Sequence, residues 1–233
     1  MTITSTANEG LKAARKLRRR AERERRGAFV AEGEDLLAAA DAAGWEPERR
    51  FCAAGSGLAG EEVAPEVLAA ASALGSGTRA LAIYRRRWAS APAGPLCVYL
   101  HGVRDPGNVG TVLRSAAAFG AASVALGPGC ADPYGPKAVR ASMGAIFAMP
   151  LARAAPADLP GETVALHQDA EEPLHGPAAG PVTLLVGAER EGLPAEVLAA
   201  CDRAARIPIA TESLNAAMAA TVGLYELTRM ARA

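Results

Sequence analysis

The feature that most constrains this chain is the alternation of short apolar runs with helical segments after residue 95. The runs have the length of buried strands, and turn-forming residues follow several of them. They are LCVYL at 96–100, SVALG at 123–127, IFAMPLA at 146–152, TVALH at 163–167, PVTLLVG at 181–187 and ARIPI at 205–209. Helical patterns lie between them at 109–119 and 136–143, and a closing pattern begins at Ser213. This order predicts an α/β fold with a largely parallel sheet covered by helices on both faces.

The chain before this alternation predicts a separate, smaller α/β domain. Its expected elements are a basic helix at 9–26, the apolar run GAFVAEG, a helix near 35–43 and the strand-like runs RRFCAA and ALAIYRRR. The stretch WASAPAGP at 88–95 then combines small residues with prolines, as linkers do. We therefore expect one domain over residues 1–90 and a second over residues 91–233.

The basic segment at 9–26 departs from the average of the chain. The 233 residues have a net charge of zero, but this segment contains nine Lys or Arg residues against three Glu residues. Its small apolar residues recur at helical spacing and lack the bulk of membrane anchors. The segment is therefore either a solvated helix face or a contact for nucleic acid, and its pattern alone does not choose between them. The candidate RNA contacts are Lys12, Arg15, Lys16, Arg18, Arg19 and Arg20.

Composition argues against several classes of protein. Half of the residues are hydrophobic, enough for a core, but no apolar run reaches the roughly 18 residues that cross a bilayer. No apolar segment follows the basic N-terminal stretch, so a signal peptide is not expected. The four cysteines form no CxxC pair, and the three histidines lack metal-ligand spacing. We expect a cytoplasmic protein with reduced thiols, no membrane contact and no metal.

The loop after the first strand of the second domain contains two candidate functional residues. Ligands of parallel sheets bind at the carboxyl ends of strands, where this loop should lie. Asn108 is of a type that caps helices, and Arg114 lies about two turns into a nearly apolar helix. An arginine there is either exposed to solvent or directed into a site, where its fork suits phosphate.

Two later loops have a similar composition. Gly187 and Gly192 flank Glu189, which would let the backbone approach a ligand closely, although a carboxylate there could simply cap a helix. Ser213 and Asn215 precede the closing helix and are both capping residue types. Each loop taken alone is weak evidence for a site.

Together and in this order, the three loops resemble the motifs of the SpoU/TrmH family of SPOUT methyltransferases. The family motifs are Asn-x-Gly-x-x-x-Arg, Gly-x-Glu-x-x-Gly, and an Ile-Pro pair joined to Ser-Leu-Asn. The matching residues are Asn108, Gly110 and Arg114, then Gly187, Glu189 and Gly192, then Ile207, Pro208, Ser213, Leu214 and Asn215. The N-terminal segment also looks like the start of the family's RNA-binding domain, which is similar to ribosomal protein L30e.

The resemblance implies a fold and an activity that periodicity alone does not reveal. The fold would be a SPOUT sheet with a deep trefoil knot, a rare exception to the rule against threaded chains. The activity would be methylation of an RNA ribose 2′-hydroxyl by S-adenosylmethionine, carried out by a homodimer. The presence of an N-terminal domain of this kind favours 23S ribosomal RNA over transfer RNA as the substrate.

The resemblance also implies roles for individual residues. Arg114 would help the ribose hydroxyl react, by stabilising developing negative charge or binding phosphate rather than by acting as a literal base. The other roles fall into four groups. Asn108 and Glu189 would orient Arg114 or the substrate, and Ser213 and Asn215 would hold the nucleotide or shape a loop. The cofactor would be contacted by Gly187, Ile207 and Leu214. The candidates for the dimer interface are Leu224 and Tyr225.

The chain departs from the family pattern in its third loop. The stretch IPIATESLN is about two residues shorter than usual and lacks a glycine found in relatives. An alternative hypothesis is a non-catalytic RNA-binding or ribosome-assembly factor. A third, a nicotinamide-dependent oxidoreductase, needs a G-x-G-x-x-G turn that HGVRDPGNVG does not provide.

Overall fold

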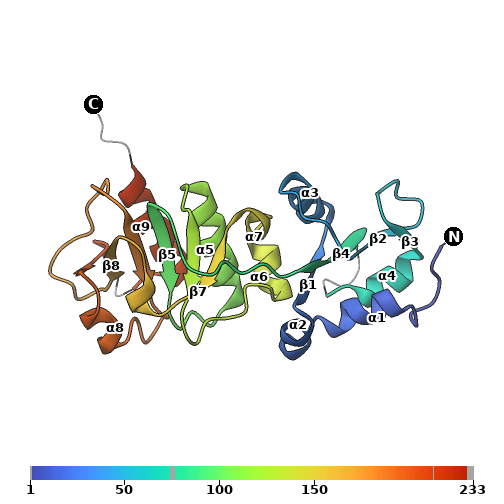
Figure 1. Ribbon diagram of the computed structural model, residues 1–233, viewed down its shortest axis with the longest axis horizontal. Coiled ribbons are helices and arrows are strands. Elements are labelled where there is room, and N and C mark those ends of the chain that lie inside the picture. The colour runs from blue at the N-terminus through green and yellow to red at the C-terminus, as the bar shows by residue number, and fades with distance from the viewer. Residues whose placement is uncertain (1, 74–76, 212, 230–233) are drawn as a thin grey trace. The chain divides into compact units, whose positions relative to one another are not determined.

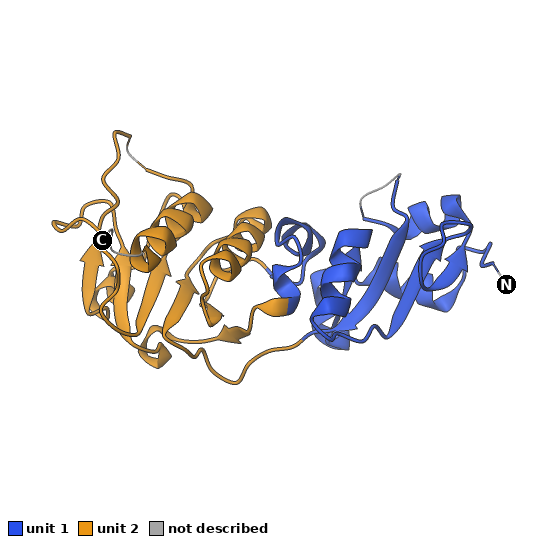
Figure 2. Ribbon diagram, turned by 90° about the horizontal axis from the view of Figure 1, so that it is seen from above, with its two compact units in different colours: residues 1–86, 132–147 blue, residues 87–131, 148–233 orange. Residues whose placement is uncertain are grey.

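A computed structural model of the protein describes residues 2–73, 77–211 and 213–229, and the chain divides into two compact units (Figure 2). The first unit contains residues 1–86 and 132–147, and the second contains residues 87–131 and 148–233. The sequence predicts a single boundary near residue 90. The structure differs because residues 132–147, expected in the second domain, pack into the core of the first unit.

The first unit is built on a four-stranded sheet with the order β1-β4-β2-β3 (Figure 1). Its strands are β1 (Ala28–Glu32), β2 (Arg49–Ala53), β3 (Glu61–Val63) and β4 (Ala80–Arg85). The β4 strand pairs antiparallel with β1 and β2, whereas β2 and β3 are parallel. The strand-like runs expected around 27–33, 49–54 and 80–87 are thus strands of this sheet.

The basic segment forms two helices instead of one. They are α1 (Glu9–Lys16) and α2 (Arg20–Arg26). Leu17 is buried at the end of α1, and Gly27 ends α2 with a positive φ of 61°, a backbone conformation that favours glycine. The unit also contains α3 (Glu34–Ala42) and α4 (Pro65–Ala71).

Residues 132–147 contribute aromatic side chains to the core of the first unit. They include α6 (Pro136–Ala141) and most of α7 (Ala145–Ala148). The Tyr134 ring lies 4.8 Å from that of Phe29, and the Phe147 ring lies 5.2 Å from that of Trp45, centroid to centroid. The indole of Trp45 also donates a 2.8 Å hydrogen bond to the Phe147 carbonyl. Aromatic burial on this scale anchors the segment to the first unit.

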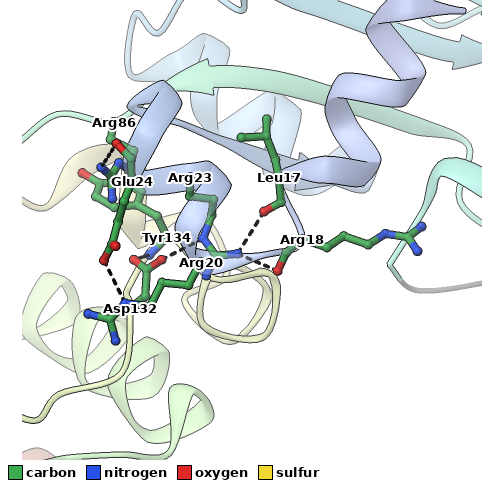
Figure 3. Close-up of polar contacts among 8 residues, drawn as sticks. All are labelled: Leu17, Arg18, Arg20, Arg23, Glu24, Arg86, Asp132 and Tyr134. Carbon is green, nitrogen blue, oxygen red and sulfur yellow. Dashed lines mark hydrogen bonds and ion pairs between the residues drawn. The ribbon is translucent and has the colours of Figure 1, made fainter.

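A buried ion pair holds the start of the same segment (Figure 3). The Nε atom of Arg23, on α2, donates to Asp132 over 2.7 Å, and both side chains are less than one-tenth exposed. Arg23 Nη1 also donates to the carbonyls of Leu17 and Arg18, at 2.9 and 2.8 Å, where α1 ends. The guanidinium therefore donates hydrogen bonds both to the end of α1 and to the carboxylate. These bonds offset the free-energy cost of removing its charge from water.

The second unit confirms the predicted parallel sheet, which has six strands in the order β10-β8-β9-β5-β6-β7 (Figure 1). They are β5 (Leu96–Leu100), β6 (Ser123–Leu126), β7 (Leu151–Arg153), β8 (Glu162–Leu166), β9 (Val182–Val186) and β10 (Arg203–Ala205), and all adjacent pairs are parallel. The last strand was expected at 205–209 and lies earlier. Its pairing with β8 ends at Ala205, and Pro208 could not donate a ladder hydrogen bond.

Helices cover both faces of this sheet. On one face, α5 (Pro106–Ala118) lies beside α9 (Ala216–Thr228), and the Oγ atoms of Ser115 and Thr221 are 2.7 Å apart. A Cβ atom at Gly223 would lie 2.8 Å from a Leu184 methyl, so glycine allows α9 to approach β9 closely. The opposite face packs against α8 (Ala195–Ala199). A short 3₁₀ helix (Pro156–Asp158) precedes β8.

The ends and exposure of α9 correct two expectations. The helix begins at Ala216 rather than Ser213, because Asn215 is its N-cap. Leu224 is fully buried within its own chain, so it is not available for the dimer interface that the sequence assigned to it, whereas Tyr225 is 56% exposed. Met230, the last residue of the expected helix, lies outside the described residues. Among the described helices, none is long and apolar enough to cross a bilayer.

Candidate active site

A cavity of about 420 Å³ lies at the carboxyl ends of β8, β9 and β10. Parallel strands all end at the same edge of the sheet, so the loops that follow them meet there. Three chain segments line the cavity: 166–168, 186–192, and parts of 206–219. Among the residues predicted for the site, those that line it are Gly187, Glu189, Gly192, Ile207, Pro208, Ser213 and Leu214.

Two glycines shape the loop after β9. Ala188 and Gly192 bond to each other through both backbone groups, with N···O distances of 3.1 and 3.0 Å. Gly192 has a φ of 66°. A Cβ atom at Gly187 would lie 2.2 Å from the carbonyl carbon of Gly192, so no other residue fits there without moving the loop. The second motif therefore has its glycines for a steric reason.

A chain of side-chain hydrogen bonds joins the three motif loops. Asn215 Nδ2 donates to Asn108 Oδ1 over 3.1 Å, and Asn108 Nδ2 donates to the Glu189 carboxylate. The Asn108 amide is thereby held from both sides, and its orientation is fixed by one acceptor and one donor partner. Because Glu189 lines the cavity, this chain of bonds positions a carboxylate at the cavity wall.

The sequence predicts that Asn108 caps α5, but the N-cap of this helix is Asp105. The Asp105 carboxylate accepts from the Asn108 backbone N–H over 3.0 Å, and Pro106 occupies the first helical position. The amide of Asn108 is therefore available for Glu189. At α9 the capping prediction is confirmed, since Asn215 Oδ1 accepts from the N–H groups of Ala217 and Met218 at 2.9 and 3.3 Å.

Arg114 does not line the cavity of its own chain. It lies two turns along α5 from Asn108, is exposed, and forms no hydrogen bond or ion pair with the residues that the structure describes. Thr111, one turn earlier, is exposed on the same side of the helix. The structure thus brings Asn108, Glu189 and Asn215 together and leaves Arg114 on the surface.

Several cavity residues were missed from sequence. His167 and Gln168 follow β8, and Arg206 follows β10, with its Nη1 donating to the carbonyl of Ala170 over 2.8 Å. The signal that could have found them is position, because both strands end at the edge where the motif loops lie. A cavity wall is completed by whatever residues follow neighbouring strands.

Tyr99, near the carboxyl end of β5, keeps its phenolic proton. Burial, with smaller contributions from nearby Cys130 and Cys201, raises the pKa of Tyr99 to about 12. Its hydroxyl lies 3.1 Å from His101 Nδ1. The phenol therefore stays protonated at neutral pH and serves as a structural hydrogen-bonding group.

The predicted RNA contacts differ in their surroundings. Arg15 donates to the Thr6 carbonyl and Arg18 to the Ser72 carbonyl, so both also brace the first unit. Exposed ion pairs engage two others, Lys12 with Glu9 and Arg20 with Glu24. Lys16 and Arg19 are exposed at the end of α1 and just after it.

Comparison with known proteins identifies the family. The chain matches the SpoU rRNA Methylase family over residues 95–225, more than half of its length. It belongs to the SpoU rRNA methylase family. Residues 8–81 also match the MRM3-like substrate binding domain.

Relatives match the chain over different lengths. Uncharacterized tRNA/rRNA methyltransferases of Mycobacterium bovis and Mycobacterium tuberculosis are 41% identical over 56% of this chain and 50% of their own length. The match therefore spans about half of these relatives. An uncharacterized tRNA/rRNA methyltransferase of Synechocystis is 32% identical over 98% of this chain and 93% of its own. A 23S rRNA uridine 2′-O-methyltransferase of Streptomyces viridochromogenes is 38% identical over 54% of this chain and 49% of its own.

Solved structures resemble the chain along nearly its whole length. An rRNA methyltransferase from Sinorhizobium meliloti with bound AdoMet has a TM-score of 0.87 and 31% identity, covering 97% of both chains. The SpoU methyltransferase AviRb from Streptomyces viridochromogenes, in complex with AdoMet, has a TM-score of 0.80 and 25% identity over 95% of this chain and 97% of that one.

Proposed function

We propose that this protein transfers the methyl group of S-adenosylmethionine to the 2′-hydroxyl of an RNA ribose. The observation that carries the proposal is the chain of hydrogen bonds from Asn215 through Asn108 to Glu189 at the cavity. It ties together one residue from each of the three motifs. A protein that only bound RNA would have no need for a fixed carboxylate at the wall of a separate ligand cavity.

The cavity fits the proposed cofactor. Its volume of about 420 Å³ is within the range of roughly 300 to 1,000 Å³ that is typical of small-molecule sites. Ile207 and Leu214 offer apolar surface for a purine ring, and Gly187 lines the cavity with backbone atoms alone. The AdoMet complexes of the Sinorhizobium and Streptomyces neighbours support the same assignment.

When bound, S-adenosylmethionine supplies a methyl group on positively charged sulfur, which is already reactive toward a nucleophile. The chain must then position the weakly nucleophilic ribose hydroxyl and ease the loss of its proton. Glu189, held by Asn108, places negative charge where a sulfonium is attracted. Ser213 lines the same cavity and offers a hydroxyl to a nucleotide. Arg114 would stabilise the developing alkoxide through its guanidinium.

This role for Arg114 requires a second copy of the chain. The exposed side of α9 carries three large apolar residues at helical spacing, Met218, Val222 and Tyr225, which are 62%, 41% and 56% exposed. Arg114 is exposed on α5, which lies beside α9. We infer a homodimer that covers this apolar stripe and brings Arg114 of one protomer to the cavity of the other.

The substrate proposed for this dimer is 23S ribosomal RNA. The name of the Streptomyces relative, a 23S rRNA 2′-O-methyltransferase at 38% identity, favours it over transfer RNA. A cytoplasmic location is part of the same proposal, because that is where ribosomal RNA is available. The trefoil knot and the L30e-like character of the first unit stay predictions.

The proposal is tested with purified protein, labelled S-adenosylmethionine and ribosomal RNA transcripts. We expect label to enter RNA, and the phosphodiester bond after the labelled nucleotide to resist alkali, because a methylated 2′-oxygen cannot attack the neighbouring phosphate. Label on a base would leave that bond sensitive to alkali and would contradict ribose methylation. Binding of RNA without any transfer would favour the non-catalytic factor.

The assignment of Arg114 to the partner's cavity predicts complementation between two inactive variants. Arg114→Ala and Gly187→Ala chains with different affinity tags are co-expressed, and the mixed dimer is isolated. If the arginine acts across the dimer, one site keeps both an intact cavity and an intact arginine, and roughly half of the wild-type rate per dimer is expected. If it acts within its own chain, the mixed dimer is as inactive as either parent. Ultracentrifugation and thermal melting of each variant check assembly and folding.

A further inference from the structure

A second hollow, of about 350 Å³, lies in the first unit, and none of the residues assigned above to the methyl-transfer cavity lines it. It is formed by α1, the last turn of α2 and the adjoining sheet. Five cationic side chains from three separate parts of the sequence line it: Lys12, Lys16, Arg25, Arg26 and Arg49. Two acidic residues, Glu9 and Glu48, line it as well. The lining residues therefore have three more positive than negative charges.

Most of these cations form ion pairs with exposed or partly exposed carboxylates. Arg49 forms a two-pronged pair with Glu61, at 2.6 and 2.7 Å. Arg25 pairs with Glu22 at 2.7 Å, and Arg26 pairs with Glu48 at 3.7 Å. The single-contact pairs of Arg25 and Arg26 are weak, so a phosphate that accepts two guanidinium hydrogen bonds can replace their carboxylate partners. Lys16 has no ion-pair partner among the described residues.

The close packing of α1 against β2 leaves room for the Arg49 side chain in this hollow. A Cβ atom at Gly10 would lie 2.5 Å from the Phe51 ring and 3.0 Å from the Arg49 guanidinium, so glycine lets α1 lie close to β2 without displacing Arg49. Gly27 ends α2 directly after Arg25 and Arg26, which places both side chains at one end of the helix. The cations thus converge because of the packing of α1, α2 and β2, and not because of their order in the sequence.

We propose that this hollow binds the sugar–phosphate backbone of the RNA substrate, a proposal that rests on the proposed function. Its lining has five cationic side chains and two apolar ones, Ala13 and Ile83. That chemistry suits a regularly charged backbone better than a peptide, which also needs pockets for apolar side chains. Of the six contacts expected from sequence, Lys12 and Lys16 line the hollow, and Arg25, Arg26 and Arg49 are added to them.

The salt dependence of RNA binding tests this site. The affinity for a fluorescein-labelled hairpin from the ribosomal transcript is measured by anisotropy between about 50 and 200 mM KCl. In the triple variant Lys16→Gln, Arg25→Gln, Arg26→Gln, the slope of log affinity against log salt is expected to fall by about two to three, because each lost phosphate contact removes slightly less than one.

A matched control removes the same charge from the same unit. In the triple variant Arg79→Gln, Lys137→Gln, Arg140→Gln, all three side chains lie outside the hollow. An equal loss of slope in both variants overturns the site, because it would mean that only overall charge matters. If wild-type protein binds RNA through the hollow but transfers no methyl group, the proposed function fails and the hollow stands. If transfer occurs and the hollow variant keeps its full slope, only the hollow fails.

Discussion

Replacing Arg114 with alanine should lower the rate of methyl transfer by about 10²- to 10³-fold, the typical cost of losing one charge-stabilising donor. The reason is that the guanidinium is the proposed partner of the oxygen that loses its proton. Binding of S-adenosylmethionine should remain nearly unchanged, because Arg114 does not line the cavity of its own chain. Titration calorimetry gives the cofactor affinity, and single-turnover transfer at saturating RNA gives the rate.

Two further variants make this prediction specific. Arg114→Lys keeps the charge but loses the planar fork, so an intermediate rate is expected. Arg203→Ala removes an arginine that pairs with Glu162 at the start of β10, at the edge of the sheet opposite the cavity, and should leave transfer unchanged. Unaltered turnover in Arg114→Ala would remove this residue from the mechanism and, with it, the need for a second chain at the site.

Replacing Arg23 with alanine should destabilise the first unit by about 3–5 kcal/mol, the usual cost of breaking a buried ion pair from one side. Asp132 would be left charged and less than one-tenth exposed, and the carbonyls of Leu17 and Arg18 would lose a donor. Denaturant unfolding of the full chain is followed by the fluorescence of Trp45, in a Trp88→Phe background so that the signal reports on the first unit. The loss should appear as a lower unfolding midpoint.

A double-mutant cycle separates the ion pair from the other contacts of Arg23. Asp132→Ala alone should also be costly, and the double variant should lose less than the sum of the two single changes, because no unpaired buried charge remains. Arg25→Ala is the matched control on the same helix, and its exposed pair with Glu22 should contribute little. Strictly additive losses would show that Arg23 and Asp132 do not stabilise each other.

The candidate site shows which kind of residue a sequence motif can assign. Glu189, Asn108 and Asn215 were predicted as a group, and the structure joins them by hydrogen bonds across as many as 107 positions. The exact partners were not predictable. Asn108 was expected to cap α5, but Asp105 precedes Pro106 and takes that role, which leaves the Asn108 amide for the carboxylate. A capping residue type identifies a helix start only to within a turn.

Residues without a motif were harder to place. Leu224 and Tyr225 are neighbours in one apolar helix, yet Leu224 is fully buried and Tyr225 is 56% exposed. The orientation of the helix about its own axis decides which of the two side chains faces β9. His167 and Arg206 became cavity residues only once the strand order placed β8 beside β10. The periodic pattern fixes which residues share a helix face, but not what that face packs against.

Local pattern alone determined the parallel sheet of the second unit, most of its strands and the residues of three loops, since strand length, capping and turn formation depend on neighbours a few positions away. The tertiary structure decided that residues 132–147 complete the first unit, where Asp132 meets Arg23 across 109 positions of sequence. It also decided that cations from α1, α2 and β2 face one hollow. Such contacts are set by the path of the whole chain, because the partners of a buried charge must be brought together in space and no local spacing encodes where they lie.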